Sequence, residues 1–288
     1  MGRRGASLYL CGGLQSSGST LISWCFLQRP DMDGILDADN DLLPQIDPAI
    51  GRPLVWYKTT LSCFRLSELV DYYRDEGWNV RPLLVIRDLR RVWASLLTKP
   101  YARNGLTAED PPLRLRIRRF VEDWQTALRR GWATIRYESL VEEPQRTLEN
   151  VCRHLYLPWD DSMVRWPKRT ENIADAQWGN ETFRSTCGQG LIETLARGRK
   201  RSQSPTIPPG DLDWLQREFR QFNIENGYPL VLRSAEMLAT SIADSTPTFR
   251  VTRRYDWETK RKPVRWLLSR LGIPNQKLID RRSWKRAA

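Results

Sequence analysis

Short apolar runs that alternate with helical patterns are the feature that most limits how this chain can fold. Five runs are expected to form strands: Leu8–Cys11, Gly34–Leu36, Leu54–Tyr57, Leu83–Ile86 and Thr134–Tyr137. Such short apolar runs are typical of parallel strands that are buried on both faces. Helical patterns follow most of them, over residues 18–29, 66–77, 89–98, 114–130 and 144–156. This alternation predicts a parallel sheet with helices on both faces.

The carboxyl-terminal half of the chain is patterned differently. From 159 to 210 the strand and helix patterns weaken into polar sequence with Gly and Pro, which ends in SQSPTIPPGD. The next stretch, DLDWLQREFRQFNIENGY, predicts a further helix, with Asp211 or Asp213 at its start and Gly227 just past its end.

The net charge of +12 is concentrated at one end of the chain. Residues 245–288 contain 13 Lys or Arg and 3 Asp or Glu, so they carry +10, whereas residues 1–244 carry only +2. We therefore expect one domain over 1–244, a basic C-terminal extension over 245–288, and no nucleic-acid partner. The extension contains KRKPVRWLLSRLGIP, a basic amphipathic stretch suited to an anionic membrane surface or a polyanion. The alternative is a solvated extension that packs a Trp/Leu face on the domain.

Neither a membrane span nor a disulfide framework is indicated. No window approaches the roughly 18 to 20 apolar residues of a transmembrane helix, and MGRRGASLYLCGG is a poor signal peptide. The five cysteines are odd in number and have no CxxC spacing: Cys11, Cys25, Cys63, Cys152 and Cys187. They are expected to be reduced thiols of a cytoplasmic protein.

A first anion site is indicated by GLQSSGST, Gly13–Thr20. It has the spacing of a nucleotide-binding P-loop, G-x-x-x-x-G-K-[ST], but Ser19 stands where the lysine should be. The loop joins an expected strand to an expected helix, so its amides, the helix amino terminus and the hydroxyls of Ser17, Ser19 and Thr20 would be donors to a phosphate. The alternative is a Ser/Gly turn that only caps the helix. The missing lysine argues against a nucleoside triphosphate.

A second anion site is indicated by PLLVIRDLRRVWASLL. Arg87 lies at the carboxyl end of an expected strand and Ser95 lies two turns into the following helix. Ligands of open α/β sheets bind at that edge. An arginine can clamp a phosphate through two hydrogen bonds, and a serine adds one. The alternative is a salt bridge between Arg87 and Asp88 that begins a surface helix.

Together these motifs resemble those of the sulfotransferases that use 3′-phosphoadenosine-5′-phosphosulfate (PAPS). The family's first loop, P-[RK]-[SA]-G-T-T-[LW], is matched in degraded form by Gln15–Leu21. Its second motif, V-x-R-[DN]-x-[RK]-x-x-x-x-S, is matched by Val85–Ser95, and a third stretch that begins Y-E-D-L is matched by Tyr137–Pro158. The resemblance covers roughly residues 7–160. It implies a P-loop NTPase-like sulfotransferase fold, with a three-layer α/β arrangement.

The resemblance also implies the roles of individual residues. The first loop would hold the 5′-phosphosulfate of the donor through Gln15, Ser16, Ser17, Gly18, Ser19 and Thr20. Arg87 and Ser95 would hold the 3′-phosphate, and Tyr137 would lie beside the adenine. Relatives often close over the 3′-phosphate with a late basic segment, here Arg197, Gly198 and Arg199, although a disordered basic loop is the alternative. The product would be adenosine 3′,5′-bisphosphate (PAP), and no metal ion is required.

The first loop departs from the family at Ser16, where relatives have Arg or Lys aimed at the bridging oxygen of the donor. Another cation should replace it, or the enzyme is slow or inactive. We expect Lys58, because VWYKTT resembles the K-T-H stretch of the family's cytosolic branch, whose lysine touches the sulfuryl group. A surface lysine at a strand end is the alternative. Thr60 stands in the place of that branch's histidine base.

A carboxylate is therefore expected as the base. A count without gaps from the first loop places Asp37 at the Glu position of the tyrosylprotein branch, at the end of a short apolar run. Asp33, Asp39 and Asp41 are rivals, and a solvated acidic loop is the alternative. The only histidine, His154, is expected to be structural. The expected reaction is an in-line displacement, in which Asp37 takes the proton of the attacking hydroxyl.

The acceptor is expected to be a hydroxyl of a carbohydrate or glycoconjugate. Several tryptophans lie near segments that shape the acceptor site in relatives: Trp124, Trp132, Trp159, Trp166 and Trp178. Flat aromatic rings suit sugars, but buried packing explains them equally well. A lipid-linked or natural-product hydroxyl and a tyrosine stay open as acceptors. Two other functions also stay open: a P-loop small-molecule kinase, and a non-catalytic protein that binds nucleotide or polyanion.

Overall fold

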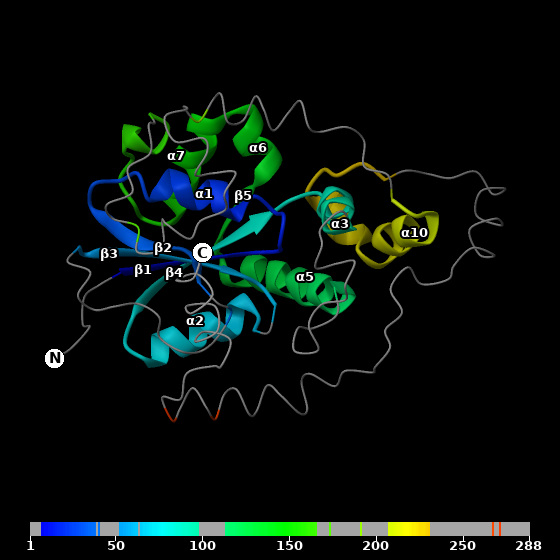
Figure 1. Cartoon of the computed structure of the whole chain (residues 1–288), viewed down its shortest axis with the longest axis horizontal. Helices are drawn as coiled ribbons and strands as arrows, with labels where there is room; N and C mark the ends of the chain where they lie inside the picture. Colours follow the sequence, from blue (N-terminus) through cyan, green and yellow to red (C-terminus); the bar gives the residue numbers. More distant parts are fainter. Residues whose placement is uncertain are drawn as a thin grey trace, which may run out of the picture.

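The computed structural model describes residues 7–38, 40, 52–62, 64–97, 113–165, 173, 191, 207–230, 267 and 271. Within them, a five-stranded parallel sheet lies at the centre of the molecule (Figure 1). Its strands are β1 Ser7–Gly13, β2 Met32–Ala38, β3 Leu54–Thr60, β4 Asn79–Ile86 and β5 Ala133–Arg136. Their order in space is β2-β3-β1-β4-β5.

The apolar runs of the sequence form these strands because both faces of the sheet are covered. In the central strand β1, every residue after Ser7 is buried. A strand buried on both faces requires a continuous apolar run instead of alternation. The register aligns Gly13 of β1 with Thr60 of β3 and Val85 of β4, so these strands end at one edge. The five predicted strands and the predicted fold class are confirmed.

Helices cover both faces of the sheet (Figure 1). One apolar cluster joins the sheet to three helices: α1 Ser19–Phe26, α6 Tyr137–Glu142 and α7 Pro144–His154. A second cluster, on the other face, involves α2 Leu66–Asp75, α3 Leu89–Leu97, α5 Leu113–Arg130 and α10 Pro209–Glu218. A short 3-10 helix, η1 Asp161–Met163, follows α7. The described elements therefore form three layers.

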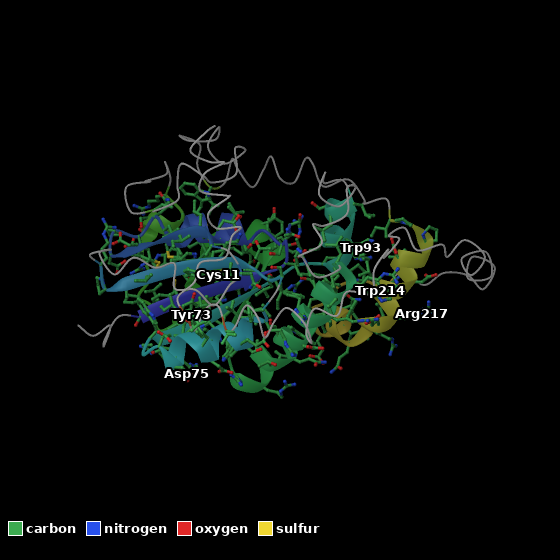
Figure 2. All side chains as sticks on the ribbon, turned by 60° about the horizontal axis from the view of Figure 1, so that its bottom comes forward. Cys11, Tyr73, Asp75, Trp93, Trp214 and Arg217 are labelled. Atoms are coloured by element: carbon green, nitrogen blue, oxygen red, sulfur yellow. The ribbon has the colours of Figure 1, made fainter. Side chains whose placement is uncertain are left out.

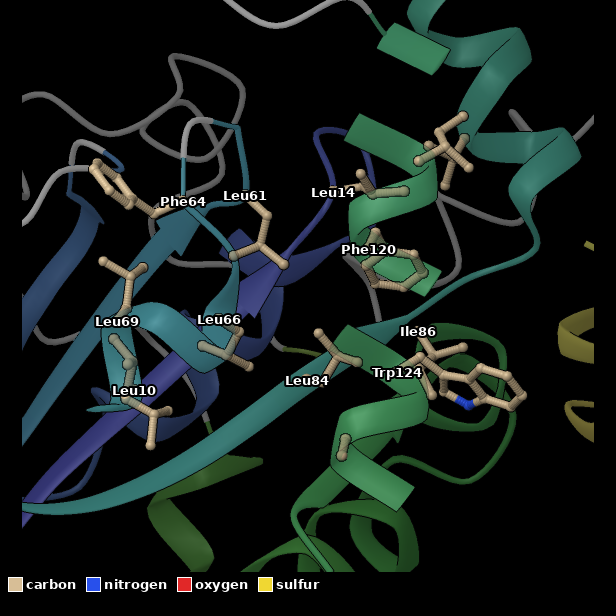
Figure 3. Close-up of a cluster of buried hydrophobic side chains, with 14 of the residues drawn as sticks. Leu10, Leu14, Leu61, Phe64, Leu66, Leu69, Leu84, Ile86, Phe120 and Trp124 are labelled. Carbon is tan, nitrogen blue, oxygen red and sulfur yellow. The ribbon is translucent and has the colours of Figure 1, made fainter. Parts of the chain in front are cut away.

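The second cluster holds α5 against the central strands (Figure 3). Leu84 of β4 and Phe120 of α5 are almost completely buried in it. The buried apolar residues of α5 recur at the helical period: Leu113, Ile117, Phe120, Trp124 and Ala127. An amphipathic stripe of this width is what makes a long helix stable on a sheet. The helix ends before Gly131, whose φ of 63° lies in the left-handed region.

The predicted end of the fifth strand is wrong by one residue. β5 ends at Arg136, and Tyr137 is the first residue of α6, a short helix that the sequence did not predict. The tyrosine therefore leaves the sheet at its carboxyl edge. This placement matters for the site, because it brings the Tyr137 ring beside the loop that follows β1.

The predicted start of the late helix is also wrong. The helix α10 begins at Pro209 with Pro208 as its N-cap, so neither Asp211 nor Asp213 caps it. Proline is accepted there because the first backbone N–H groups of a helix need no partner within it. Asp211 instead accepts hydrogen bonds from Trp93 Nε1 at 3.1 Å and from Arg114 Nη2 at 2.9 Å, which joins α10 to α3 and α5.

The late helix is interrupted as well. It breaks at Phe219 into α10 and α11 Arg220–Glu225. Gly227 follows α11 with a φ of 68°, as a residue past a helix end should. Trp214 of α10 packs on Trp93 of α3 with 5.3 Å between the ring centroids (Figure 2).

Some predictions concern residues outside the described part of the chain. Of the extension 245–288, only Leu267 and Leu271 are described, and both are exposed. The division at residue 244 stays a prediction.

Cys11, Cys25 and Cys152 are buried, while Cys63 and Cys187 lie outside the described residues. Among the described helices, none combines the length and the apolar character that crossing a membrane would need.

Candidate active site

The loop after β1 is shaped by two residues with positive φ. Ser16 has a φ of 65° and Gly18 a φ of 90°, and between them Ser17 N donates to Leu14 O at 3.1 Å. The loop thus turns back on itself before α1 begins at Ser19. Backbone N–H groups that gather in such a turn at a helix amino terminus form an anion-binding concavity.

The Ser17 hydroxyl is a further donor in this loop. Ser17 is 1% exposed, and its Oγ has no hydrogen-bond partner within the described residues. It lies over Gly13, where a Cβ would approach Oγ to 2.6 Å. A glycine is therefore needed at 13 for the loop to close in this way. A buried hydroxyl without a partner is costly, so this one is well placed to bind a ligand.

Arg87 connects the second motif to the loop. It follows β4 directly, and its Nη1 donates to the carbonyl oxygen of Ser16 at 2.6 Å. Its Nε is buried and has no hydrogen-bond partner in the part of the chain that is described. Ser95 of α3 donates from Oγ to Ser16 Oγ at 3.0 Å. Both residues of the second motif therefore contact the residue where the first loop departs from the family.

The third motif meets the other two through Tyr137. The Arg87 guanidinium carbon lies 4.3 Å from the centroid of the Tyr137 ring, a cation–π contact. The ring also lies against Gly18, where a Cβ would come within 2.2 Å of Tyr137 Cδ2. A side chain at 18 would therefore displace the tyrosine. The fold brings three stretches that are distant in sequence to one place at the sheet edge.

Glu138 supports this arrangement, and sequence reasoning assigned it no role. Its Oε1 accepts from Asp88 N at 3.1 Å and its Oε2 accepts from Tyr228 OH at 3.0 Å. Burial, followed by the charge of Glu138, raises the pKa of Tyr228, which keeps the phenol protonated as a donor. Asp88 in turn binds Arg90 and not Arg87. The salt bridge weighed between Arg87 and Asp88 is therefore replaced by one between Asp88 and Arg90.

Lys58 and Asp37 form an ion pair on neighbouring strands. Lys58 Nζ donates to Asp37 Oδ1 at 2.7 Å and to Thr60 Oγ1 at 3.1 Å. The lysine is 2% exposed, whereas the side chain of Asp37 is half exposed. Lys58 is therefore not the surface lysine of the alternative view. The pair lies at the carboxyl ends of β2 and β3, where Asp37 is open to solvent or to a ligand.

The rivals of Asp37 are placed differently. Asp33 lies near the start of β2, opposite Val55, and is paired with Arg52 Nε at 3.3 Å. Its position at the opposite end of the strand makes it a poor base for chemistry at the carboxyl edge. Asp39 and Asp41 lie outside the described residues.

A buried arginine of α5 also reaches the loop, and sequence reasoning missed it. Arg116 is 3% exposed and donates from Nη1 to Gln15 Oε1 at 2.8 Å. The two residues are 101 positions apart. No local pattern could have indicated this contact, although a basic residue on the apolar face of an amphipathic helix was a visible signal.

The buried thiols are unsuited to nucleophilic chemistry. Burial raises the pKa of Cys11 to about 12 and that of Cys152 to about 11. Both stay protonated near neutral pH, and the thiolate is the reactive form. In the described part of the chain, no group of three or more His, Cys, Asp or Glu side chains is placed to hold a metal ion.

The structure describes only some of the remaining predicted residues. Arg197, Gly198, Arg199, Trp166 and Trp178 lie outside the described residues. Trp124 is 2% exposed in the core, so it is not part of an acceptor surface. Trp132 and Trp159 are partly buried. His154 is exposed and its Nδ1 lies 2.9 Å from Asn150 O, within its own helix, which agrees with a structural role.

The class of protein follows from this geometry. A parallel sheet in the order 2-3-1-4-5, with a glycine and serine loop that leads into a helix at its carboxyl edge, is a P-loop-like α/β fold. Residues 51–161 match the family model described as the sulfotransferase family. The predicted resemblance to sulfotransferases is confirmed, and the match supports sulfotransferase activity. The matched stretch contains Lys58, Arg87, Ser95 and Tyr137, and the first loop precedes it.

Solved structures with the same fold include two sulfotransferase domains. The domain from the Synechococcus PCC 7002 olefin synthase is 14% identical, with a TM-score of 0.53, and the match covers 80% of this chain and 98% of that one. The domain from the curacin biosynthetic pathway is 16% identical, also with a TM-score of 0.53, over 79% of this chain and 100% of that one. At these identities the likeness shows the fold. A search among curated proteins gives no match.

Proposed function

We propose that this chain transfers a sulfuryl group from PAPS to a hydroxyl acceptor. The observation that carries the proposal is the meeting of the loop, Arg87, Ser95 and Tyr137 at one point of the sheet edge. Two groups of donors there are our candidates for anion sites: the turn with the Ser17 hydroxyl, and the Arg87 guanidinium with Ser95. A nucleotide with separate 5′ and 3′ anionic groups fits such a pair. A nucleoside triphosphate has one chain of phosphates and would leave the second site empty.

The loop and the second motif would divide the donor between them. The turn around Ser17 and the start of α1 would bind its 5′-phosphosulfate, and Arg87 with Ser95 would bind its 3′-phosphate in place of Ser16. Tyr137 would pack against the adenine. Arg197, Gly198 and Arg199 would close over the 3′-phosphate. When bound, the donor supplies an electrophilic sulfur with PAP as its leaving group.

In this proposal the Lys58–Asp37 pair would carry the proton and charge changes of the transfer. The half-exposed carboxylate of Asp37 would accept the proton of the acceptor hydroxyl as its oxygen bonds to sulfur. Lys58 would stabilise negative charge on the phosphate oxygen that departs as the old sulfur–oxygen bond breaks. These residues can act without a metal ion, because the lysine supplies the positive charge at the edge.

For the acceptor we propose a hydroxyl of a carbohydrate or glycoconjugate as the first candidate. The burial of Trp124 removes one of the aromatic rings that suggested a sugar site, so a natural-product hydroxyl is the second candidate. It is favoured by the two solved domains, which come from an olefin synthase and from the curacin biosynthetic pathway. Peripheral contact of residues 245–288 with a membrane or polyanion, in a cytoplasmic setting, completes the proposal.

The donor is tested by comparing ligands in a thermal-shift measurement. A ligand that binds the native state raises the melting temperature, and at equal concentration the tighter ligand raises it more. PAP should stabilise the protein most, ahead of ATP with Mg²⁺ and of an oligonucleotide. A larger shift with ATP and Mg²⁺ would favour a kinase, and a larger shift with the oligonucleotide a non-catalytic polyanion binder. Incubation with labelled PAPS and a panel of glycans, natural-product alcohols and peptides would then identify the acceptor.

A further inference from the structure

Tyr228 reaches the candidate site from outside the stretch that contains the sulfotransferase motifs. It follows α11, so it lies beyond the family match over residues 51–161 and beyond the three motifs. Its side chain is buried, with 5% exposed, and its hydroxyl donates to Glu138 Oε2 at 3.0 Å. The two residues are 90 positions apart. This hydrogen bond joins the late helices to the third motif at the carboxyl edge of the sheet.

The position of the Tyr228 hydroxyl is fixed by what surrounds the residue. Its backbone N–H donates to Asn223 O at 2.8 Å, which holds it to α11. Its ring packs on Phe222 with 5.9 Å between the ring centroids, and the guanidinium carbon of Arg136 lies 5.2 Å from the centroid of the Tyr228 ring. A ring that is packed in this way has little rotamer freedom, so its hydroxyl can hold the Glu138 carboxylate in one orientation.

Glu138 extends this constraint to the second motif. Its other oxygen, Oε1, accepts from Asp88 N at 3.1 Å. Asp88 is 4% exposed and lies between Arg87 and the start of α3, the helix that contains Ser95. Glu138 itself follows Tyr137 in the first turn of α6. The carboxylate therefore connects the tyrosine of the third motif to the backbone that carries both phosphate-binding candidates of the second.

We propose that Tyr228 is a positioning residue of the 3′-phosphate site and that it acts through Glu138. The inference rests on the proposed function, in which Arg87 and Ser95 bind the 3′-phosphate and Tyr137 packs against the adenine. The ribose fixes the spacing between the adenine and the 3′-phosphate, so the protein groups that bind them must keep a matching spacing. Tyr228 orients Glu138, and Glu138 maintains this spacing through the backbone N–H that follows Arg87. A buried N–H without a partner is costly, so this segment would shift if the carboxylate turned away.

The test measures the preference for PAP over adenosine 5′-monophosphate, the ratio of their dissociation constants by calorimetry, because these ligands differ only in the 3′-phosphate. Tyr228→Phe removes the hydroxyl and keeps the ring. It should lower the preference by about 3- to 10-fold, as expected for loss of one hydrogen bond, and leave the affinity for adenosine 5′-monophosphate within about twofold. Tyr9→Phe is the matched control, because Tyr9 is 3% exposed but lies near the start of β1, away from the carboxyl edge. It should not change the preference. If Tyr228→Phe leaves the preference unchanged, even with both affinities reduced, the tyrosine only supports the fold and the inference is wrong.

A double-mutant cycle tests the route through Glu138. Glu138→Ala should lower the same preference by about tenfold or more, because it removes the acceptor of the Asp88 N–H. In that background Tyr228→Phe should change the preference by less than about twofold, since the hydroxyl has no carboxylate left to orient. Losses that multiply would show that Tyr228 acts by another route and would contradict the inference. If Glu138→Ala does not fold, the Tyr228→Phe measurement decides by itself. If the wild-type protein binds neither nucleotide, or binds both equally, the donor assignment fails and this inference falls with it.

Discussion

The pH dependence of stability should carry the signature of Asp123. Its carboxylate, 1% exposed on α5, accepts from Leu66 N at 2.6 Å, from Ser67 N at 3.0 Å and from Ser67 Oγ at 3.0 Å. Burial disfavours the charged form and these donors favour it. Burial is the larger effect and raises the pKa from its ordinary 3.8 to about 6.

The sign and size of the effect follow from this shift. Between about pH 4 and pH 6 the folded protein keeps a proton on Asp123 that the unfolded chain releases. The contribution to stability is therefore complete below pH 4 and is lost as the pH rises through 6. A shift of about two pKa units corresponds to about 3 kcal/mol. Since Asn does not titrate, the free energy of unfolding of the wild type minus that of Asp123→Asn should fall by about 3 kcal/mol between pH 4 and pH 7.

Urea unfolding followed by tryptophan fluorescence at several pH values measures this difference. Asp71→Asn is the control, because Asp71 lies on α2 with its side chain 54% exposed and pairs with Arg130 on the surface. Its difference from the wild type should change little over the same range. A difference for Asp123→Asn that stays constant, or that grows with pH, would show that the three hydrogen bonds outweigh burial and that the reasoning is wrong.

Three further predictions concern the site. Gly18→Ala should destabilise the protein by about 1–3 kcal/mol more than Gly77→Ala in urea unfolding. Both glycines have φ near 90°, but only a Cβ at 18 collides with Tyr137. Equal losses in the two variants would contradict the contact. Arg87→Ala should cost about 1.5–3 kcal/mol of PAP affinity by calorimetry, and unchanged binding would remove it from the 3′-phosphate site. Asp37→Asn should abolish sulfuryl transfer in a turnover assay while PAP still binds, whereas near-normal turnover would exclude it as the base.

The strands were predictable because their environment leaves a local mark. A strand covered on both faces must be apolar throughout, and β1 and β4 show such runs in the sequence. The ends of strands and helices were harder to predict than their positions. Tyr137 continues an apolar run but begins a helix, and the late helix breaks at Phe219 without a glycine or proline to announce it. Both outcomes depend on packing against distant elements, which overrides local preference.

The candidate site was partly predictable for a similar reason. Arg87 and Lys58 could be singled out because each lies near the carboxyl end of a strand, where parallel sheets bind ligands. The pairing of Lys58 with Asp37 could not be inferred, because it requires β2 to lie beside β3 in a given register. The same holds for Gln15 and Arg116, whose contact depends on where α5 crosses the edge of the sheet.

The sequence by itself determined roughly where the five strands lie, where the loop after β1 turns, and that three motifs resemble those of sulfotransferases. These properties are local, since they depend on apolar runs, glycines and fixed spacings within one segment. The tertiary structure decided which of these segments meet. It placed Tyr137 against Gly18, Arg87 on Ser16 and a buried arginine of α5 beside a loop that has no charge of its own. Such contacts join residues tens of positions apart, and only the order of the strands and the packing of helices on the sheet fix them.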